Sequence, residues 1–365
     1  MSVEIWPPIS PDDLKTQEDA TQARELTWLL TSLQNTLAQL KRGLEDCVAL
    51  LAPDDAAGST LALTTPRNET VKGHATRVGT QLVRGVVHLR LRTLPPQTLA
   101  LDPARPVRVA ALTRLDSLLE QSVGLCRDLE EHEHRQQPPS APYLASQLRL
   151  LAQHIAEASG LVKGAPTPHP TRASTPNPTL AAPSVQLRPT SSSGGGSTQT
   201  QDPGQRPDTT WTTASVSLGH FTPPISRNLS LYLTIQDACL VLYLRALEPA
   251  DAPVNFGTKL ALAIGTTRRL EHDEADRVFV YQCDEESHFE GSSPHTSLSA
   301  ATERAAAGEG GKGTRDVEVY VREKVRVESP DPSLLSLSAK LSALGNTLGL
   351  ARRNLAAVMG DDVED

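Results

Sequence analysis

The chain has few of the residues from which most ligand sites are built. Aromatic residues make up 3% of its 365 residues, so an aromatic-lined pocket is not expected and the cores must be built from Leu, Val and Ala. The cysteines show no C-x-x-C pair and no spacing typical of zinc ligands, which argues against a disulfide framework or a structural zinc site. We expect reduced, small hydrophobic side chains at all four positions, which are Cys47, Cys126, Cys239 and Cys283.

An excess of positive charge and long apolar runs are missing as well. The sequence has 35 Lys and Arg against 43 Asp and Glu, and this formal charge of −8 disfavours binding to nucleic acid or to an anionic membrane. No run of about 18 apolar residues is present to span a bilayer, and residues 1–15 lack the basic and then apolar order of an export signal. We therefore expect a soluble, cytoplasmic protein with no nucleic-acid partner and no direct membrane insertion.

Catalytic signatures are also missing. Residues 308–314 read Gly-Glu-Gly-Gly-Lys-Gly-Thr, but Gly313 stands where a P-loop needs a magnesium-binding Ser or Thr. The cluster at 130–134 has its two histidines two residues apart, on different sides of a helix, so a solvated helix end is favoured over a metal site. No nucleophile elbow and no paired-carboxylate spacing is evident. These absences predict a protein that is not an enzyme and that holds no cofactor or metal.

What the sequence does contain is leucine at helical spacing. Between Glu25 and Leu51 apolar residues recur at alternating steps of three and four, which is an a/d stripe that must pack on other helices to leave water. The segment 331–360 repeats this pattern behind an Asp-Pro start, and two more helical patterns lie in 106–162. We therefore expect one antiparallel bundle. The residues predicted to form its seam are Leu26, Leu30, Leu33, Leu37, Leu40, Leu44, Leu334, Leu337, Leu341, Leu344, Leu348 and Leu355.

Alternation with a period of two predicts β-strands in most other segments. In the stretch 81–92, apolar residues alternate with a polar face that carries Arg84, His88, Arg90 and Arg92. Because the chain is acidic overall, we interpret this face as solvated rather than as a phosphate-binding patch.

The fold class expected is α+β, with an antiparallel bundle of N-terminal, central and C-terminal helices and a separate, mainly antiparallel β domain. Thr167, Thr175 and Ser293 each precede a proline and are candidate phosphorylation sites, although segments so rich in Ser, Thr and Pro contain such pairs by chance. The expected divisions are a flexible N-terminus (1–21), a discontinuous helical domain (22–52, 106–162 and 331–360), a discontinuous β domain (56–105 and 208–328), disordered insertions (164–206 and 286–315) and an acidic tail (361–365).

The order of these pieces resembles the Rogdi family, which includes the small subunit of the fungal RAVE complex. Residues 25–30, Glu-Leu-Thr-Trp-Leu-Leu, are similar to the family's opening Glu-x-x-Trp-Leu-Leu, and Val71-Lys72-Gly73 resembles its first β segment. The hairpin at 228–249, which ends in Ala-Leu-Glu-Pro, resembles the longest family block. None of these motifs is catalytic. The resemblance implies a bundle made from both ends of the chain and a role in assembling the vacuolar proton-pumping ATPase (V-ATPase).

On this resemblance, we expect a non-catalytic scaffold or regulatory subunit of a RAVE-like complex that promotes V-ATPase assembly. The implied partners are a large β-propeller-bearing RAVE subunit and the peripheral V-ATPase sector, which would recruit the protein to vacuolar or endosomal membranes. The alternative is a homodimeric coiled-coil tether or adaptor that uses the Leu26–Leu51 helix. Because four seams can cover one another within a chain, we expect a monomer and favour the intramolecular bundle.

Overall fold

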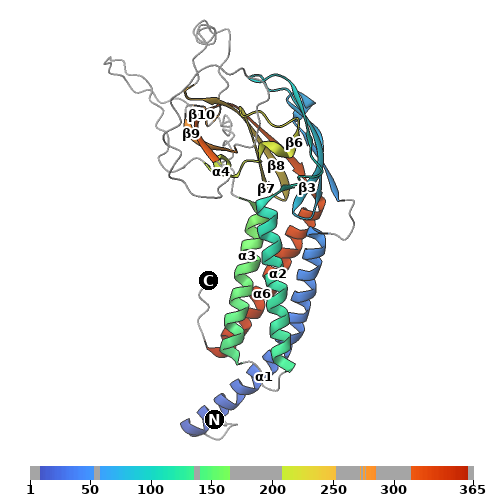
Figure 1. Cartoon of the computed structure of the whole chain (residues 1–365). Helices are drawn as coiled ribbons and strands as arrows, with labels where there is room; N and C mark the ends of the chain where they lie inside the picture. The colour runs from blue at the N-terminus through green and yellow to red at the C-terminus, as the bar shows by residue number, and fades with distance from the viewer. Residues whose placement is uncertain are drawn as a thin grey trace, which may run out of the picture.

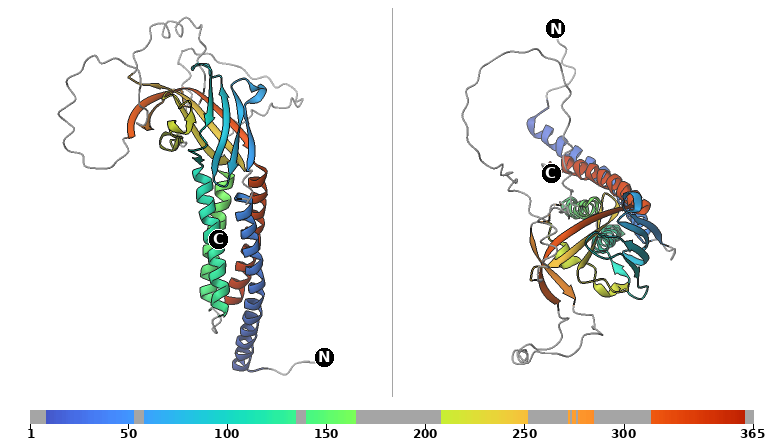
Figure 2. Two further views of the ribbon diagram at one scale, coloured as in Figure 1. Left: turned by 45° about the vertical axis from the view of Figure 1, so that its right-hand side comes forward. Right: turned by 90° about the horizontal axis from the view of Figure 1, so that it is seen from above.

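The protein consists of a rod of four long helices with a head of β-strands packed on one end (Figures 1 and 2). The computed structural model describes residues 9–52, 58–134, 140–164, 208–251, 272, 274–275, 277–284 and 314–360. The rod contains α1 (Pro11–Leu51), α2 (Ala110–His134), α3 (Ala141–Lys163) and α6 (Pro332–Met359). The predicted α+β class is confirmed.

The four helices form a closed ring because each one packs against two others. α1 contacts α2 and α6, and α3 contacts the same two helices. The first and last helices of the chain are therefore neighbours, running in opposite directions. At one end of this pair Lys340 Nζ lies 2.7 Å from Asp46 Oδ2, and at the other Gln22 Nε2 donates to the Val358 carbonyl at 2.9 Å.

α1 begins at Pro11, so the prediction of a flexible N-terminus up to residue 21 is wrong in its boundary. Ser10 caps the helix by accepting a hydrogen bond from the Asp13 amide, and Pro11 occupies the first turn, where it needs no hydrogen-bond partner. Pro11 thus starts a helix in a segment that was expected to be flexible. Residues 11–21 are exposed and extend beyond the rest of the bundle (Figure 1).

The head contains two antiparallel sheets. The larger has the order β1 (Ser59–Thr64), β2 (Val71–Val78), β3 (Gln81–Leu89), β4 (Gln97–Leu101) and β6 (Phe221–Thr222), and β5 (Val107–Arg108) also pairs with β3. The smaller has the order β7 (Leu229–Gln236), β8 (Cys239–Pro249), β10 (Thr314–Pro330) and β9 (Val278–Asp284). Three short helical turns also lie in the head: η1 (Pro66–Asn68) between β1 and β2, and α4 (Trp211–Ala214) and η2 (Leu218–His220) before β6.

Three predicted segment boundaries differ from the structure. The central helical segment, predicted from 106, begins later, because residues 107–108 form β5 and α2 begins only at Ala110. β10 begins at Thr314, inside the predicted insertion, and continues to Pro330, beyond the predicted end of the β domain. The rest of both predicted insertions and the acidic tail lie outside the described residues, apart from Gly164.

Bundle and head share one continuous hydrophobic core. The same cluster of buried side chains contains Leu44 of α1, Leu99 of β4 and Leu242 of β8. At the junction, the buried Arg77 of β2 donates from Nε to Asp331 Oδ2 at 2.6 Å and from Nη1 to the Leu51 carbonyl at 2.9 Å. The β part is thus packed directly on the bundle. A separate β domain had been expected from the sequence.

The turn between β7 and β8 also joins the head to the bundle. Asp237 and Ala238 both have positive φ (49° and 57°), as a tight two-residue hairpin turn requires. Their amides donate to the Lys163 and Val162 carbonyls at 2.9 and 3.0 Å, and so satisfy acceptors at the end of α3. The hairpin therefore caps a bundle helix.

Candidate functional site

The predicted bundle seam lies inside the rod. Most of its leucines are buried, while Leu26, Leu30 and Leu344 are only partly buried. Leu29, which lies outside the predicted stripe, is buried instead. These leucines pack against helices of the same chain, so the seam is not an open binding surface. The fully buried seam positions are Leu33, Leu37, Leu40, Leu44, Leu334, Leu337, Leu341, Leu348 and Leu355.

Other sequence-based candidates fall outside the described part of the structure. Thr167, Thr175 and Ser293 are not among the described residues, and the side chains of 132–134 are not described either. Among the described residues, no group of three or more His, Cys, Asp or Glu side chains lies close enough to hold a metal ion. No described helix is both long and apolar enough to cross a lipid bilayer.

The buried thiols are protonated structural groups. Cys47 of α1 and Cys126 of α2 are fully buried in the bundle. Burial raises the pKa of Cys47 to about 11 and that of Cys126 to about 12, because the apolar surroundings disfavour the thiolate. Neither side chain is a nucleophile at neutral pH, since the thiolate is the reactive form.

A buried charged cluster holds the smaller sheet together on its α4 side. Arg245 of β8 pairs with both oxygens of Glu274, at 2.7 and 2.9 Å, and Lys324 of β10 lies 2.7 Å from the same carboxylate. The Arg245 guanidinium also lies over the Trp211 ring, 4.6 Å from its centroid. This cluster was not expected from the sequence. The available signal was Arg245, the one charged residue in the otherwise apolar run 239–247.

A group of exposed Lys, Arg and His side chains lies on the outer face of the larger sheet. Across β2 and β3, Lys72 is paired with His88 and Thr76 with Arg84. Their inward neighbours, such as Val71 and Val87, are buried in the core, and strand alternation therefore turns this set outward. We call this surface the basic face and define it by Lys72, His74, Arg84, His88 and Arg90, all of which are exposed.

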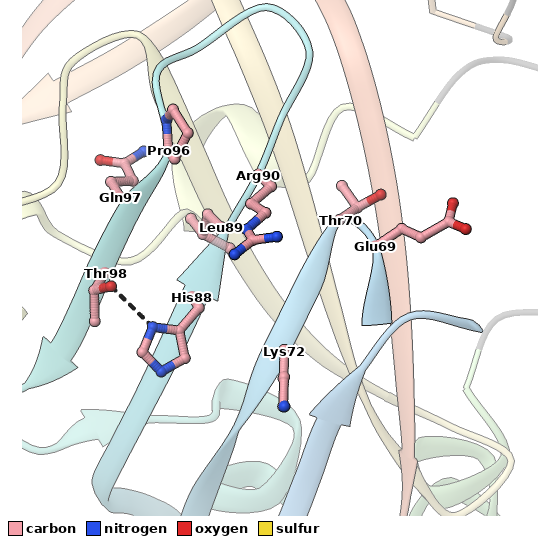
Figure 3. A pocket seen from close by; sticks show the side chains of 9 residues that line it. All are labelled: Glu69, Thr70, Lys72, His88, Leu89, Arg90, Pro96, Gln97 and Thr98. Atoms are coloured by element: carbon pink, nitrogen blue, oxygen red, sulfur yellow. Dashed lines mark hydrogen bonds between the residues drawn. The ribbon is translucent and has the colours of Figure 1, made fainter. Parts of the chain in front are cut away.

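One end of the basic face is hollowed into an open pocket of about 570 Å³ (Figure 3). Within it, His88 Nδ1 lies 2.9 Å from Thr98 Oγ1 on the neighbouring strand β4. Figure 3 shows the Glu69 carboxylate turned away from the Arg90 guanidinium. The lining residues are Glu69, Thr70, Lys72, His88, Leu89, Arg90, Pro96, Gln97 and Thr98.

The segment that forms this surface has a charge opposite to that of the whole chain. Residues 59–101 contain six Lys or Arg and one acidic residue, Glu69, which gives a formal charge of +5; the rest of the chain must then carry −13 to reach the total of −8. Only Arg77 of the six is buried against a carboxylate. Of the described residues, none forms an ion pair with Lys72, Arg84 or Arg90. The arrangement can attract an anionic ligand.

A comparison with protein families gives one match. The family model described as Rogdi leucine zipper containing protein matches residues 25–356. The match runs from the first long helix, through both sheets, into the last turns of α6. No curated protein matches the chain.

Proposed function

The chain belongs to the Rogdi family, and from this membership we propose that it is a non-catalytic scaffold or regulatory subunit of a RAVE-like complex that promotes V-ATPase assembly. The observation that carries the proposal is the extent of the family match, which includes the bundle and the head together. The proposed partners are a large β-propeller-bearing subunit and the peripheral sector of the ATPase, which would recruit the protein to vacuolar or endosomal membranes.

The geometry suits a scaffold because the rod and the head are tied into one body. The junction between them is made by the buried Arg77–Asp331 pair and by the hairpin that caps α3. A partner bound to the head is thus held at a defined distance from one bound to the far end of the rod. The tether alternative needs the Leu26–Leu51 stripe in trans, but this stripe packs mainly on helices of its own chain.

Affinity purification of the tagged, full-length protein from its own cells tests this proposal. We expect recovery of the large propeller-bearing subunit and of peripheral ATPase subunits. A second arm removes the protein and measures how much of the peripheral sector co-sediments with the membrane sector. Recovery of neither partner, together with unchanged sector association, would overturn the proposal.

A further inference from the structure

The first observation concerns where the positive charge of this acidic chain is exposed. Lys72 and Arg84 stand on the adjacent strands β2 and β3, and Arg90 directly follows β3. The outer side of these strands has one carboxylate, Glu69, at its end. Such an uncompensated patch attracts an acidic ligand through charge complementarity. Since like charges repel across neighbouring strands, the patch also has a cost for folding that a bound anion would offset.

The second observation is the spacing of these groups. Alternate residues of a strand lie on the same face, about 6.6 Å apart. His88 of β3 and Arg90, which directly follows β3 and whose amide donates to the Thr70 carbonyl at 2.8 Å, are related in this way. An extended peptide with an acidic residue at every second position presents its carboxylates at the same interval. Thr98 and Thr70 add hydroxyl groups at the edges of the pocket. The face therefore matches an extended acidic segment.

The surface suits a protein segment better than a membrane or a nucleic acid. Its outward positions include Ala62 and Val86 but no Phe, Tyr, Trp, Leu or Ile side chain that could enter a lipid layer. The rings at these positions are the imidazoles of His74 and His88, and no Phe, Tyr or Trp is present there as a platform for base stacking.

Acidic residues 361–365 cannot reach this face within one molecule. α6 leads away from the head for 28 residues, a length of about 42 Å. Residues 361–365 span about 18 Å at most when fully extended. An acidic segment on the basic face must therefore come from another part of the chain or from another molecule.

We propose that the basic face is a docking site for an extended acidic segment of a partner protein. Arg84, Lys72 and Arg90 pair with its carboxylates, and the pocket beside His88 and Thr98 receives one of its acidic side chains. The proposal rests on this surface alone and does not depend on the role in V-ATPase assembly.

Fluorescence anisotropy with a labelled ten-residue peptide of alternating Glu and Ser tests the proposal on the full chain. The test variant is Lys72→Gln/Arg84→Gln/Arg90→Gln. The matched control, Arg42→Gln/Arg149→Gln/Arg353→Gln, removes the same charge from exposed positions on the bundle. We expect the test variant to bind at least about tenfold more weakly and the control to bind as the unchanged protein does. Raising the salt concentration from 0.05 to about 0.5 M should weaken binding strongly.

Three results would overturn the proposal. The first is an equal loss of peptide binding in the test variant and in the control variant. The second is binding of a Gln-Ser peptide as tight as that of the Glu-Ser peptide. The third is that vesicles with about 30% phosphatidylserine bind the unchanged protein but not the test variant, while the peptide does not bind. A chain ending at residue 360 should bind the probe unchanged; tighter binding by it would identify the tail of a second copy as the occupant. The single variants Lys72→Gln and Arg90→Gln repeat the test in smaller steps if the triple variant does not fold. Failure here leaves the purification experiment unaffected.

Discussion

Asp331 combines two structural roles in one carboxylate. Its Oδ1 accepts from the amides of Ser333 and Leu334 and so caps α6, while Oδ2 accepts from Arg77 at 2.6 Å. Both members of the ion pair are almost completely buried. A buried charge that loses its partner is strongly destabilising, and loss of a helix cap adds to the effect.

We therefore expect Asp331→Ala to lower the free energy of unfolding by about 3–5 kcal/mol, measured by urea denaturation. Glu45→Ala is the matched control, because Glu45 faces Arg127 across exposed helix surface at 3.6 Å. This change should cost less than about 1 kcal/mol. Similar costs for the two variants would show that the junction pair contributes no more than a surface pair.

The two buried thiols predict sensitivity to alkaline pH. Folding holds the proton of Cys47 and Cys126 more tightly than the unfolded chain does, because their pKa values rise from 9.0 to about 11 and about 12. The stability that these groups contribute is complete below pH 9 and is lost as the pH rises through the folded-state pKa values. When the pH is raised from 8 to 10, each thiol ionises in the unfolded chain but stays protonated in the folded one. This difference should lower the free energy of unfolding by about 1.4 kcal/mol per thiol.

Urea titrations at both pH values, on the unchanged protein and on Cys47→Ala/Cys126→Ala, isolate this contribution. The variant is expected to be less stable at pH 8 because it has lost buried volume. However, its loss of stability between pH 8 and pH 10 should be smaller by about 3 kcal/mol. Equal losses in both proteins would contradict the prediction.

At the scale of the elements, α6 offers a comparison between two leucines six residues apart. Leu341 is 0% exposed in the bundle, whereas Leu335 is 65% exposed on the outside. We expect Leu341→Ala to lower the free energy of unfolding by about 2–5 kcal/mol through lost burial and a cavity. Leu335→Ala should change it by less than about 0.5 kcal/mol. Equal effects in thermal or urea unfolding would mean that α6 does not pack as described.

The helices and most strands could be predicted because their apolar periods are strong. The twelve seam leucines all come from α1 and α6, and the alternation at 229–235 and 317–327 lies in β7 and β10. The start of α1 was missed because its first three turns are exposed, so only the cap at Ser10 and Pro11 marked it. The contact between Gly43 of α1 and Leu344 of α6 is a feature that the apolar period does not predict. The missing side chain of Gly43 leaves room for Leu344, and an added Cβ would lie 2.5 Å from the Leu344 Cδ2 atom.

Three residues of the basic face, Arg84, His88 and Arg90, were identified in the sequence as part of the polar face of 81–92, which was interpreted as a solvated surface. The interpretation relied on the net charge of the whole chain, which averages over segments of opposite sign. Counting charges within 59–101 would have shown the asymmetry. The pocket beside His88 could not be predicted, because it depends on the register that pairs Lys72, His88 and Thr98 across three strands. Register is set by tertiary packing and turns rather than by composition.

At the scale of the whole molecule, the bundle is completed only by the last helix. Removing residues 331–365 takes away α6 and exposes leucines of both α1 and α3, since both contact it. We expect this truncation to misfold or aggregate, and the full chain to sediment as a monomer because its seams are covered internally. A stable, soluble truncation, or a dimer that dissociates on changing Leu33 and Leu37, would favour the two-chain tether.

The adjacency of α1 and α6 has a consequence for how a cell makes this protein. A ribosome produces α1 before α6, and residues 52–331, which number 280, lie between them. At about 5–20 residues per second, the side of α1 that faces α6 stays uncovered for roughly 15–60 s after it is synthesised. The bundle therefore cannot close before α6 has been synthesised, and until then the uncovered leucines of α1 are the kind of surface that leads to aggregation and that chaperones shield.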